Sequence, residues 1–353
     1  MVAAIVICFA TMSRAQQKFN VQNGTKAEFY DDLETAIQKA VSGDTIYLPG
    51  GIIEVSSDII IDKKLAIIGT GWDMDSIGGV KKTEIMSDKY VYYYGYFATI
   101  NFRNGSNGSL FTGCIVGSIN FGHKDEVNDF FHNIENVTIS RNCINGQINL
   151  GVSGVQNNQV KKIFISENFL SGAIYGHNAS ECWINNNNIG CQAVSSSATT
   201  SLSQLIDSYV YNNVFRCSGE IYGLQKCTII NNFIASNGIN ASSYCTFNHN
   251  AFTSNITFPL GTNVGFNNLI NQDIIQTFQD NNLDHPKNLV IRSTSPCKNA
   301  GTDGTDIGIY GGSAPYKPGA VPFHPHIDKA VITSQTDLDG KLKVEFKVSA
   351  QDR

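Results

Sequence analysis

One eight-residue pattern of apolar and polar positions recurs along the second half of the chain. Its first, third and eighth positions are mostly apolar, and its sixth position is asparagine. Copies begin at residues 137, 163, 182, 208, 227 and 245, and a weaker copy ends at Ile270. Successive asparagines lie 26, 19, 26, 19, 18 and 18 residues apart. Self-similarity at about 20 residues indicates a solenoid, in which each coil packs on its neighbours.

The chemistry within each copy predicts strands and turns. Apolar residues alternate with a period of two, β-branched residues are frequent, and Asn-rich segments separate the strands. Because stacked coils lie about 4.8 Å apart, each repeat position should form a column along the axis. We expect the third position to form a core column: Ile139, Ile165, Ile184, Val210, Ile229 and Phe247.

The asparagine column should occupy a tight bend. Asparagine tolerates left-handed backbone angles, and stacked amides can bond to the amides above and below them. We therefore predict a structural asparagine ladder formed by Asn142, Asn168, Asn187, Asn213, Asn232, Asn250 and Asn268.

Both ends of a parallel solenoid expose strand edges that need covering. Residues 30–41 are amphipathic at helical spacing, with Asp31 or Asp32 as N-cap, and predict a capping helix. Residues 331–348 alternate around Asp339-Gly340 and predict an antiparallel hairpin that closes the C-terminal end. The expected division is a β-helix with its cap helix at 17–305 and a connector with the hairpin cap at 306–353.

Four segments carry a family resemblance: AIQKAVSGDTIYLPGG, IIGTGWDMDS, the NVTISRNCING-type repeats and SPCKNAGTDGTDIGIYGG. They resemble the pectin-lyase-like superfamily, and more closely its secreted β-helix-repeat proteins of Bacteroidetes-type bacteria. The resemblance implies an all-β, right-handed parallel β-helix. Characterised members of the superfamily mostly act on carbohydrates, as lyases with a Lys or Arg base and usually Ca²⁺, or as hydrolases with paired carboxylates.

The chain begins with an apolar run from Val2 to Ala10, followed by Ser13-Arg14-Ala15. Residues 1–16 are interpreted as a Sec signal peptide, which predicts export to the periplasm, the cell surface or the medium. A buried N-terminal strand is the alternative. No later segment reaches about 18 consecutive apolar residues, so no transmembrane segment is expected in the mature chain.

Charge and cysteine positions narrow the possible functions. The net charge is −5, charged residues make up 16% of the chain, and no Lys/Arg-rich stripe is present, which argues against nucleic-acid binding. Cys182, Cys227 and Cys245 occupy the first inward repeat position, where they are expected to be small buried hydrophobes. A disulfide between Cys227 and Cys245 remains open.

The motifs of the characterised enzymes are missing. Asparagines stand at 185–187, where the similar stretch of pectate lyases carries Asp and His, and no polygalacturonase signature occurs. The densest titratable group could form an acid/base or cation site, or simply a solvated loop; it comprises His123, Lys124, Asp125, Glu126 and Asp129, with Arg141 shortly after. No metal site or cofactor is predicted, and Ca²⁺ enters only under the lyase alternative. His324 and His326 are assigned to the connector.

Aromatic residues offer a second candidate surface. Tyrosine and tryptophan can pack on sugar faces and bond to sugar hydroxyls, although alternation could also bury half of them. The candidate carbohydrate-binding residues are Tyr92, Tyr94, Trp183, Tyr209 and Tyr211. The leading hypothesis is an exported β-helix that presents a polar and aromatic face to carbohydrate or a cell-surface component, without recognisable catalytic motif. A polysaccharide lyase or hydrolase and a purely structural surface protein remain as alternatives.

Overall fold

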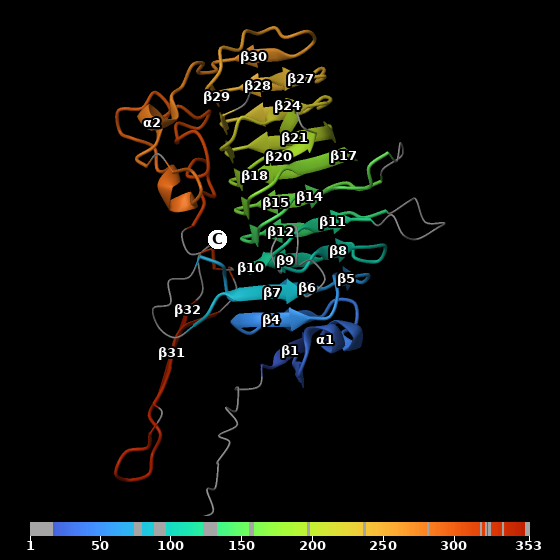
Figure 1. Cartoon of the computed structure of the whole chain (residues 1–353), viewed down its shortest axis with the longest axis vertical. Coiled ribbons are helices and arrows are strands. Elements are labelled where there is room, and N and C mark those ends of the chain that lie inside the picture. The colour runs from blue at the N-terminus through green and yellow to red at the C-terminus, as the bar shows by residue number, and fades with distance from the viewer. Residues whose placement is uncertain are drawn as a thin grey trace, which may run out of the picture.

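The computed structural model shows a parallel β-helix built from three long sheets (Figure 1). Each coil from β3 to β27 contributes one strand to each sheet, which confirms the predicted fold. The predicted signal peptide lies outside the residues that the structure describes, which are 17–73, 80–87, 97–122, 133–154, 159–195, 198–235, 238–280, 282–317, 320–321, 323, 326–333 and 335–349.

The strands of one sheet follow one another at coil-length intervals along the chain. Sheet A runs in the order β2 (Lys26–Tyr30), β1 (Phe19–Asn23), β3 (Thr45–Tyr47), β6 (Ala66–Ile68), β9 (Leu110–Thr112), β12 (Thr138–Ser140), β15 (Phe164–Ser166), β18 (Trp183–Asn185), β22 (Tyr209–Tyr211), β25 (Thr228–Ile230), β28 (Thr246–Asn248) and β30 (Val264–Phe266). Sheet B runs in the order β29 (Ala251–Phe252), β26 (Phe233–Ile234), β23 (Val214–Phe215), β19 (Asn188–Ile189), β16 (Phe169–Leu170), β13 (Cys143–Ile144), β10 (Cys114–Val116), β7 (Thr83–Ser87) and β4 (Gly51–Val55).

The third sheet completes each coil. Sheet C runs in the order β27 (Ile239–Asn240), β24 (Glu220–Tyr222), β21 (Ala198–Ile206), β17 (Ile174–Ser180), β14 (Ile148–Asn149), β11 (Ile119–Phe121), β8 (Ile100–Phe102) and β5 (Ile59–Ile61), with β20 (Gln192–Ser195) paired antiparallel to β21. Residues at the same repeat position pair directly, as Ile139 does with Ile165 and Ile165 with Ile184.

The core column lies where the repeat predicts it. All six third-position side chains are fully buried, and Cys182, Cys227 and Cys245 are buried beside them at the first position. These columns belong to one continuous apolar cluster that extends from the first coils to Phe252. The core therefore grows with the number of coils, as expected for a solenoid.

The seven asparagines form a ladder at the corner between sheets A and B, and all but the last, Asn268, are buried. Each of the first six donates its side-chain amide to the Oδ1 of the asparagine in the next coil, at 2.9–3.2 Å. Each also donates its backbone N–H to the same oxygen. The left-handed backbone falls on the residue before each ladder asparagine, not on the asparagine itself: Arg141, Glu167, Asn186, Asn212, Asn231, His249 and Asn267 have φ between 50° and 57°.

The N-terminal end is covered by a helix and a hairpin. Helix α1 (Leu33–Lys39) begins after Asp32, whose side chain accepts a hydrogen bond from the Thr35 backbone N–H at 2.7 Å. Its buried residues, Leu33, Ala36 and Ile37, pack on the first coil. Strand β1 pairs antiparallel with β3, and β2 pairs antiparallel with β1, so the first parallel edge is covered.

The C-terminal end is closed by residues of its own last coil. Phe258 packs on Phe247 and Phe252, with ring centroids 5.3 Å and 6.3 Å apart, and Ile256 packs on the same core. The predicted hairpin forms from β31 (His326–Ile332) and β32 (Val344–Ser349). It lies on the side of the molecule and projects past β7 and β4, not over the last coil near β30 (Figure 1).

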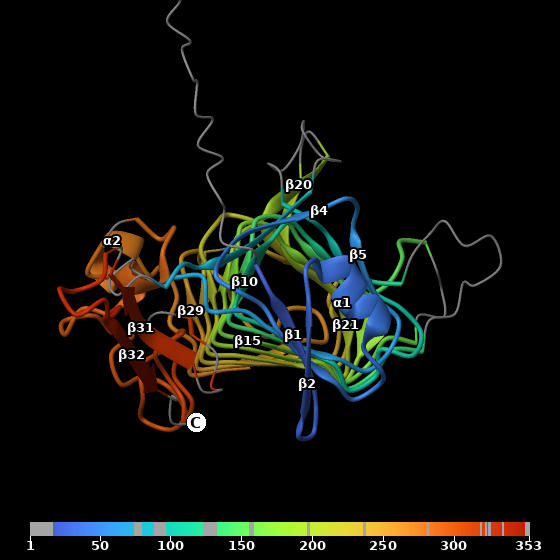
Figure 2. The same ribbon diagram turned by 90° about the horizontal axis from the view of Figure 1, so that it is seen from below.

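A long non-repetitive segment returns along the flank of the β-helix. We call residues 273–321 the strap; it contains α2 (Ile274–Thr277) and the 3₁₀ helix η2 (Pro286–Leu289). In the end-on view the strap lies beside β10 and β29, which places it over sheet B (Figure 2). Within the described residues, no helix is long and apolar enough to span a membrane.

Candidate functional site

The predicted acid/base group cannot be assembled from the described residues. His123, Lys124, Asp125, Glu126 and Asp129 all lie outside them. Arg141 is described and is almost fully buried, at the corner between sheets A and B. The groups of three or more His, Cys, Asp or Glu side chains that could hold a metal ion are absent from the described part of the chain.

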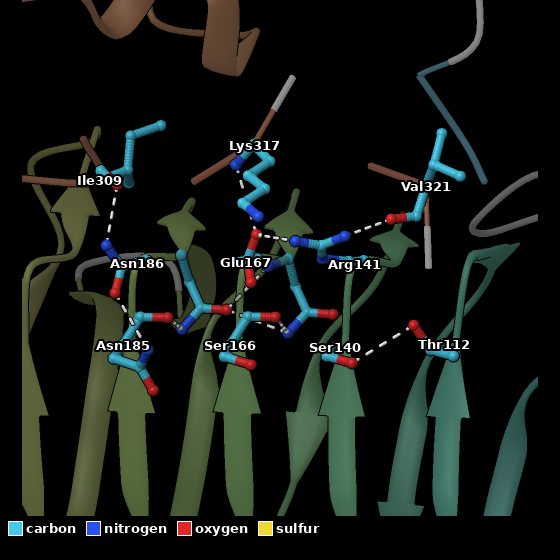
Figure 3. A network of polar contacts seen from close by, with 12 residues as sticks. Thr112, Ser140, Arg141, Ser166, Glu167, Asn185, Asn186, Ile309, Lys317 and Val321 are labelled. Atoms are coloured by element: carbon cyan, nitrogen blue, oxygen red, sulfur yellow. Dashed lines mark hydrogen bonds and ion pairs between the residues drawn. The ribbon is translucent and has the colours of Figure 1, made fainter. Parts of the chain in front are cut away.

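Arg141 belongs to a buried ion pair beneath the strap (Figure 3). Its Nη2 lies 2.8 Å from Glu167 Oε2, and the side chains of the two residues are 1% and 8% exposed. Arg141 also donates to the Val321 carbonyl, while Glu167 accepts the Lys317 backbone N–H at 3.3 Å. The phenyl ring of Phe323 lies 3.6 Å below the guanidinium carbon. These contacts join two coils to the strap.

The left-handed turns explain why these side chains reach the strap. They turn the fifth repeat residue away from the core, and four residues of this column contact the strap: Arg141, Glu167, Asn186 and Asn231. Asn186 donates to the carbonyls of Ile309 and Gly311 at 2.8 Å and 3.1 Å. Asn231 exchanges two hydrogen bonds with Thr302.

The predicted aromatic residues are placed only in part. Tyr92 and Tyr94 lie outside the described residues. Trp183, Tyr209 and Tyr211 all lie on the outward face of sheet A, on neighbouring strands β18 and β22. The strap covers sheet B and leaves this face of sheet A open (Figure 2).

Three rings of this face form a stacked aromatic column. The rings of Phe164 and Trp183 are 5.0 Å apart and inclined by 9°, and those of Trp183 and Tyr209 are 5.9 Å apart and inclined by 13°. Phe164 was not among the predicted residues, although it occupies the same second repeat position. Phe164 is 37% exposed and Tyr209 47%. Such a solvent-facing apolar stack is typical of a recognition surface.

Stacking determines which ring surfaces remain available. Both faces of the Trp183 indole are occupied by its neighbours, so the indole offers solvent an edge. The second-position neighbours beyond the stack are threonines, Thr138 before Phe164 and Thr228 after Tyr209. A threonine is too short to cover a ring, so each end of the column keeps an uncovered aromatic face.

A polar row runs beside the aromatic column at the fourth repeat position. It consists of Ser140, Ser166, Asn185 and Tyr211 on strands in direct register. Ser140 and Thr112 are hydrogen-bonded at 3.3 Å, and partial burial raises the pKa of Tyr211. The tyrosine hydroxyl therefore stays protonated at neutral pH and can donate as well as accept hydrogen bonds.

The cysteines divide into two groups. Cys227 and Cys245 are free thiols in adjacent coils, so the disulfide that the sequence left open between them is not formed. A disulfide joins Cys191 to Cys217, a pair that the sequence reasoning missed. Both stand four residues after a ladder asparagine in adjacent coils, so the repeat register contained the signal.

Comparisons with known proteins add little to this geometry. No family model and no curated protein matches the chain. Six solved chains match it, among them two DFA-IIIase structures from Arthrobacter chlorophenolicus A6: a mutant in complex with DFA-III, and the enzyme in complex with GF2. Their identities are 15% and 14%, and both TM-scores are 0.30. The match covers 59% of this chain and 58% or 57% of those chains, less than two thirds of their length.

Proposed function

We propose that this chain is an exported β-helix protein of the pectin-lyase-like kind that binds carbohydrate on the outward face of sheet A. The observation that carries the proposal is the stacked column of Phe164, Trp183 and Tyr209 on a face that the strap leaves open. Aromatic rings bordered by hydroxyl and amide groups match the alternating apolar and polar surface of a sugar.

The free ring face at the Tyr209 end is the best place for a sugar ring. A sugar packed there would lie above Thr228, with the hydroxyls of Thr228 and of Tyr211, the last member of the polar row, within its reach. The Trp183 edge and the Tyr211 hydroxyl would contact the neighbouring sugar units. Because the column runs along the axis, an extended glycan would follow the stacked strands.

This proposal assigns no catalytic step to the face. Arg141, the described member of the predicted acid/base group, is buried in an ion pair away from solvent. The lyase or hydrolase alternative therefore depends on residues 123–132, which the structure does not describe. A carbohydrate or cell-surface partner and an extracytoplasmic location are parts of the same proposal.

A glycan-binding screen with the mature chain tests the proposal. We expect binding to one class of polysaccharide, weakened about tenfold or more by Trp183→Ala or Tyr209→Ala, since each removes a central aromatic contact. Tyr244→Ala is the matched control, because Tyr244 is 68% exposed and lies outside the column. Its binding should be unchanged.

The same glycans are assayed for unsaturated and reducing ends. Release of such ends would contradict a non-catalytic role and direct attention to residues 123–132. Failure to bind any glycan, or equal affinity in the Trp183 and control variants, would exclude the sheet A face as a sugar site.

A further inference from the structure

A cluster of polar and aromatic side chains lies away from the open face of sheet A, where the strap meets the loop after β6. Trp72 and Asp73 come from that loop, His285 and Lys287 from η2 and its N-cap, and Tyr316 from the end of the strap. None of these residues belongs to the repeat columns. Trp72 also packs on Phe169 of sheet B, with ring centroids 5.6 Å apart, so the cluster is anchored to the coils.

Asp73 is held by one of its two oxygens only. Its Oδ1 lies 2.9 Å from His285 Nε2 and 3.5 Å from Lys287 Nζ, while its side chain is 9% exposed. The other oxygen, Oδ2, is buried and has no hydrogen-bond partner among the described residues. Leaving a buried carboxylate oxygen unpaired is costly, so this atom marks a place for a donor from outside the chain.

His285 positions the carboxylate and is itself fully engaged. Its Nδ1 accepts the Lys287 backbone N–H at 3.1 Å, so this nitrogen carries no proton. The proton must then lie on Nε2, which donates it to Asp73. With both ring nitrogens occupied, the imidazole orients Asp73 and has no free lone pair for a ligand.

Two unpaired donors accompany the free carboxylate oxygen. The indole Nε1–H of Trp72 and the hydroxyl of Tyr316 are buried without partners in the described part of the chain, and the two residues are only 8% and 2% exposed. Burial and the negative charge of Asp73 raise the pKa of Tyr316, so its hydroxyl keeps its proton and lies within the field of the carboxylate. The rings of Trp72 and His285, 5.8 Å apart, add an apolar wall.

We propose that Asp73, Trp72 and Tyr316 form a second binding site, which takes the end of a neutral hydroxylated ligand such as a terminal sugar residue. One acceptor and two donors match adjacent hydroxyl groups, which both donate and accept hydrogen bonds. Lys287 disfavours a cation beside Asp73, and the free carboxylate oxygen disfavours an anion. The three atoms are too deeply buried for the middle of a long polymer. This inference does not rest on the sheet A proposal.

Titration calorimetry and saturation-transfer NMR with glucose, galactose, mannose and xylose test this site. We expect one of these neutral sugars to bind, and glucosamine and glucuronate to bind at least about tenfold more weakly. Tyr316→Phe removes a single oxygen and keeps the ring; it should weaken binding about tenfold, and Asp73→Asn by more. Should Asp73→Asn fail to fold, Tyr316→Phe alone still decides the question.

Tyr310→Phe is the matched control, because the Tyr310 hydroxyl already donates to the Pro286 carbonyl at 3.0 Å. Its sugar affinity should stay at the unaltered protein's value, as should that of Trp183→Ala, which affects the other face. Absence of binding by all four neutral sugars would overturn the proposal. So would a Tyr316→Phe variant that melts at a changed temperature while it binds sugar normally, because the hydroxyl would then act only within the fold.

Discussion

The outward faces of sheets A and B are built from the same repeat but meet different surroundings. On sheet B, the seventh repeat position holds Cys143, Phe169, Asn188, Val214, Phe233 and Ala251, and all but half-buried Phe169 are buried by the strap and its neighbours. On sheet A, the second position holds three consecutive aromatic residues bordered by threonines and stays partly exposed. An apolar outward column thus identifies a face that another segment covers, and a mixed column identifies a face open to a partner.

The two faces should also differ in how much each contributes to stability. Covering sheet B removes phenylalanine and aliphatic side chains from water, each worth about 1.5–3 kcal/mol. Stacking on sheet A removes only the faces of the aromatic rings from water and leaves their edges hydrated. Substitutions can therefore separate a face that holds the protein together from a face that serves recognition.

The largest effect is expected for Phe278→Ala on the covered face. Phe278 is fully buried and meets the ring of Phe233 edge-on at 4.7 Å, so truncation leaves a cavity between strap and sheet. We expect a loss of about 3–5 kcal/mol in the free energy of unfolding, measured by urea denaturation. Hydrogen exchange should show faster opening of residues 273–321.

Ile275→Ala is the control for this change, because Ile275 lies in the short helix that ends directly before Phe278 and is 52% exposed. Its unfolding free energy should change by less than about 0.5 kcal/mol. Equal losses in both variants would mean that the strap is not held by its buried side chains.

The second-largest loss of stability is expected for Glu167→Ala, which leaves the Arg141 charge buried without its carboxylate partner. Breaking a buried pair in this way should cost about 3 kcal/mol in unfolding free energy. Glu181→Ala breaks the exposed pair with Lys162, whose atoms are 4.0 Å apart, and should cost less than about 0.5 kcal/mol. Thermal or urea unfolding of the two variants gives the comparison, since both residues have a left-handed backbone.

A double variant refines this prediction. Arg141→Met combined with Glu167→Leu replaces the ion pair by apolar side chains and should recover much of the lost stability. If the double variant is as unstable as Glu167→Ala, the hydrogen bonds to Val321 and Lys317 matter more than the unpaired charge.

The smallest effect on stability is expected for Trp183→Ala on the open face. The variant loses two ring contacts but opens no cavity in the core, so we expect about 1 kcal/mol in urea unfolding. Tyr244→Ala, outside the column, should cost less than about 0.5 kcal/mol. A loss at Trp183 as large as that at Phe278 would remove the distinction between the two faces.

The repeat made the coils, the core column and the asparagine column predictable, because each depends on contacts between residues one coil apart. The helix expected at 30–41 forms at Leu33–Lys39 for the same local reason, an N-cap followed by an amphipathic stretch. The Cys191–Cys217 disulfide and Phe164 were missed although both follow the register.

The covering of sheet B was beyond the reach of the sequence pattern. The strap has no repeat, and its hydrogen bonds join residues as far apart as Asn186 and Ile309, Glu167 and Lys317, and Arg141 and Val321. Arg141 was predicted within a catalytic group because it stands near charged residues in the chain. Its burial depends on the strap, whose residue Val321 lies 180 positions further along the chain.

The asparagine ladder has an electrical consequence. Each side-chain amide donates toward the coil that follows, so six successive amide dipoles point in the same direction along the axis. Aligned hydrogen bonds polarise one another, and the strongest polarisation falls on members with neighbours on both sides. The β-helix therefore carries a one-way row of dipoles through its corner, in which Asn213 is the middle member and Asn268 is a chain end.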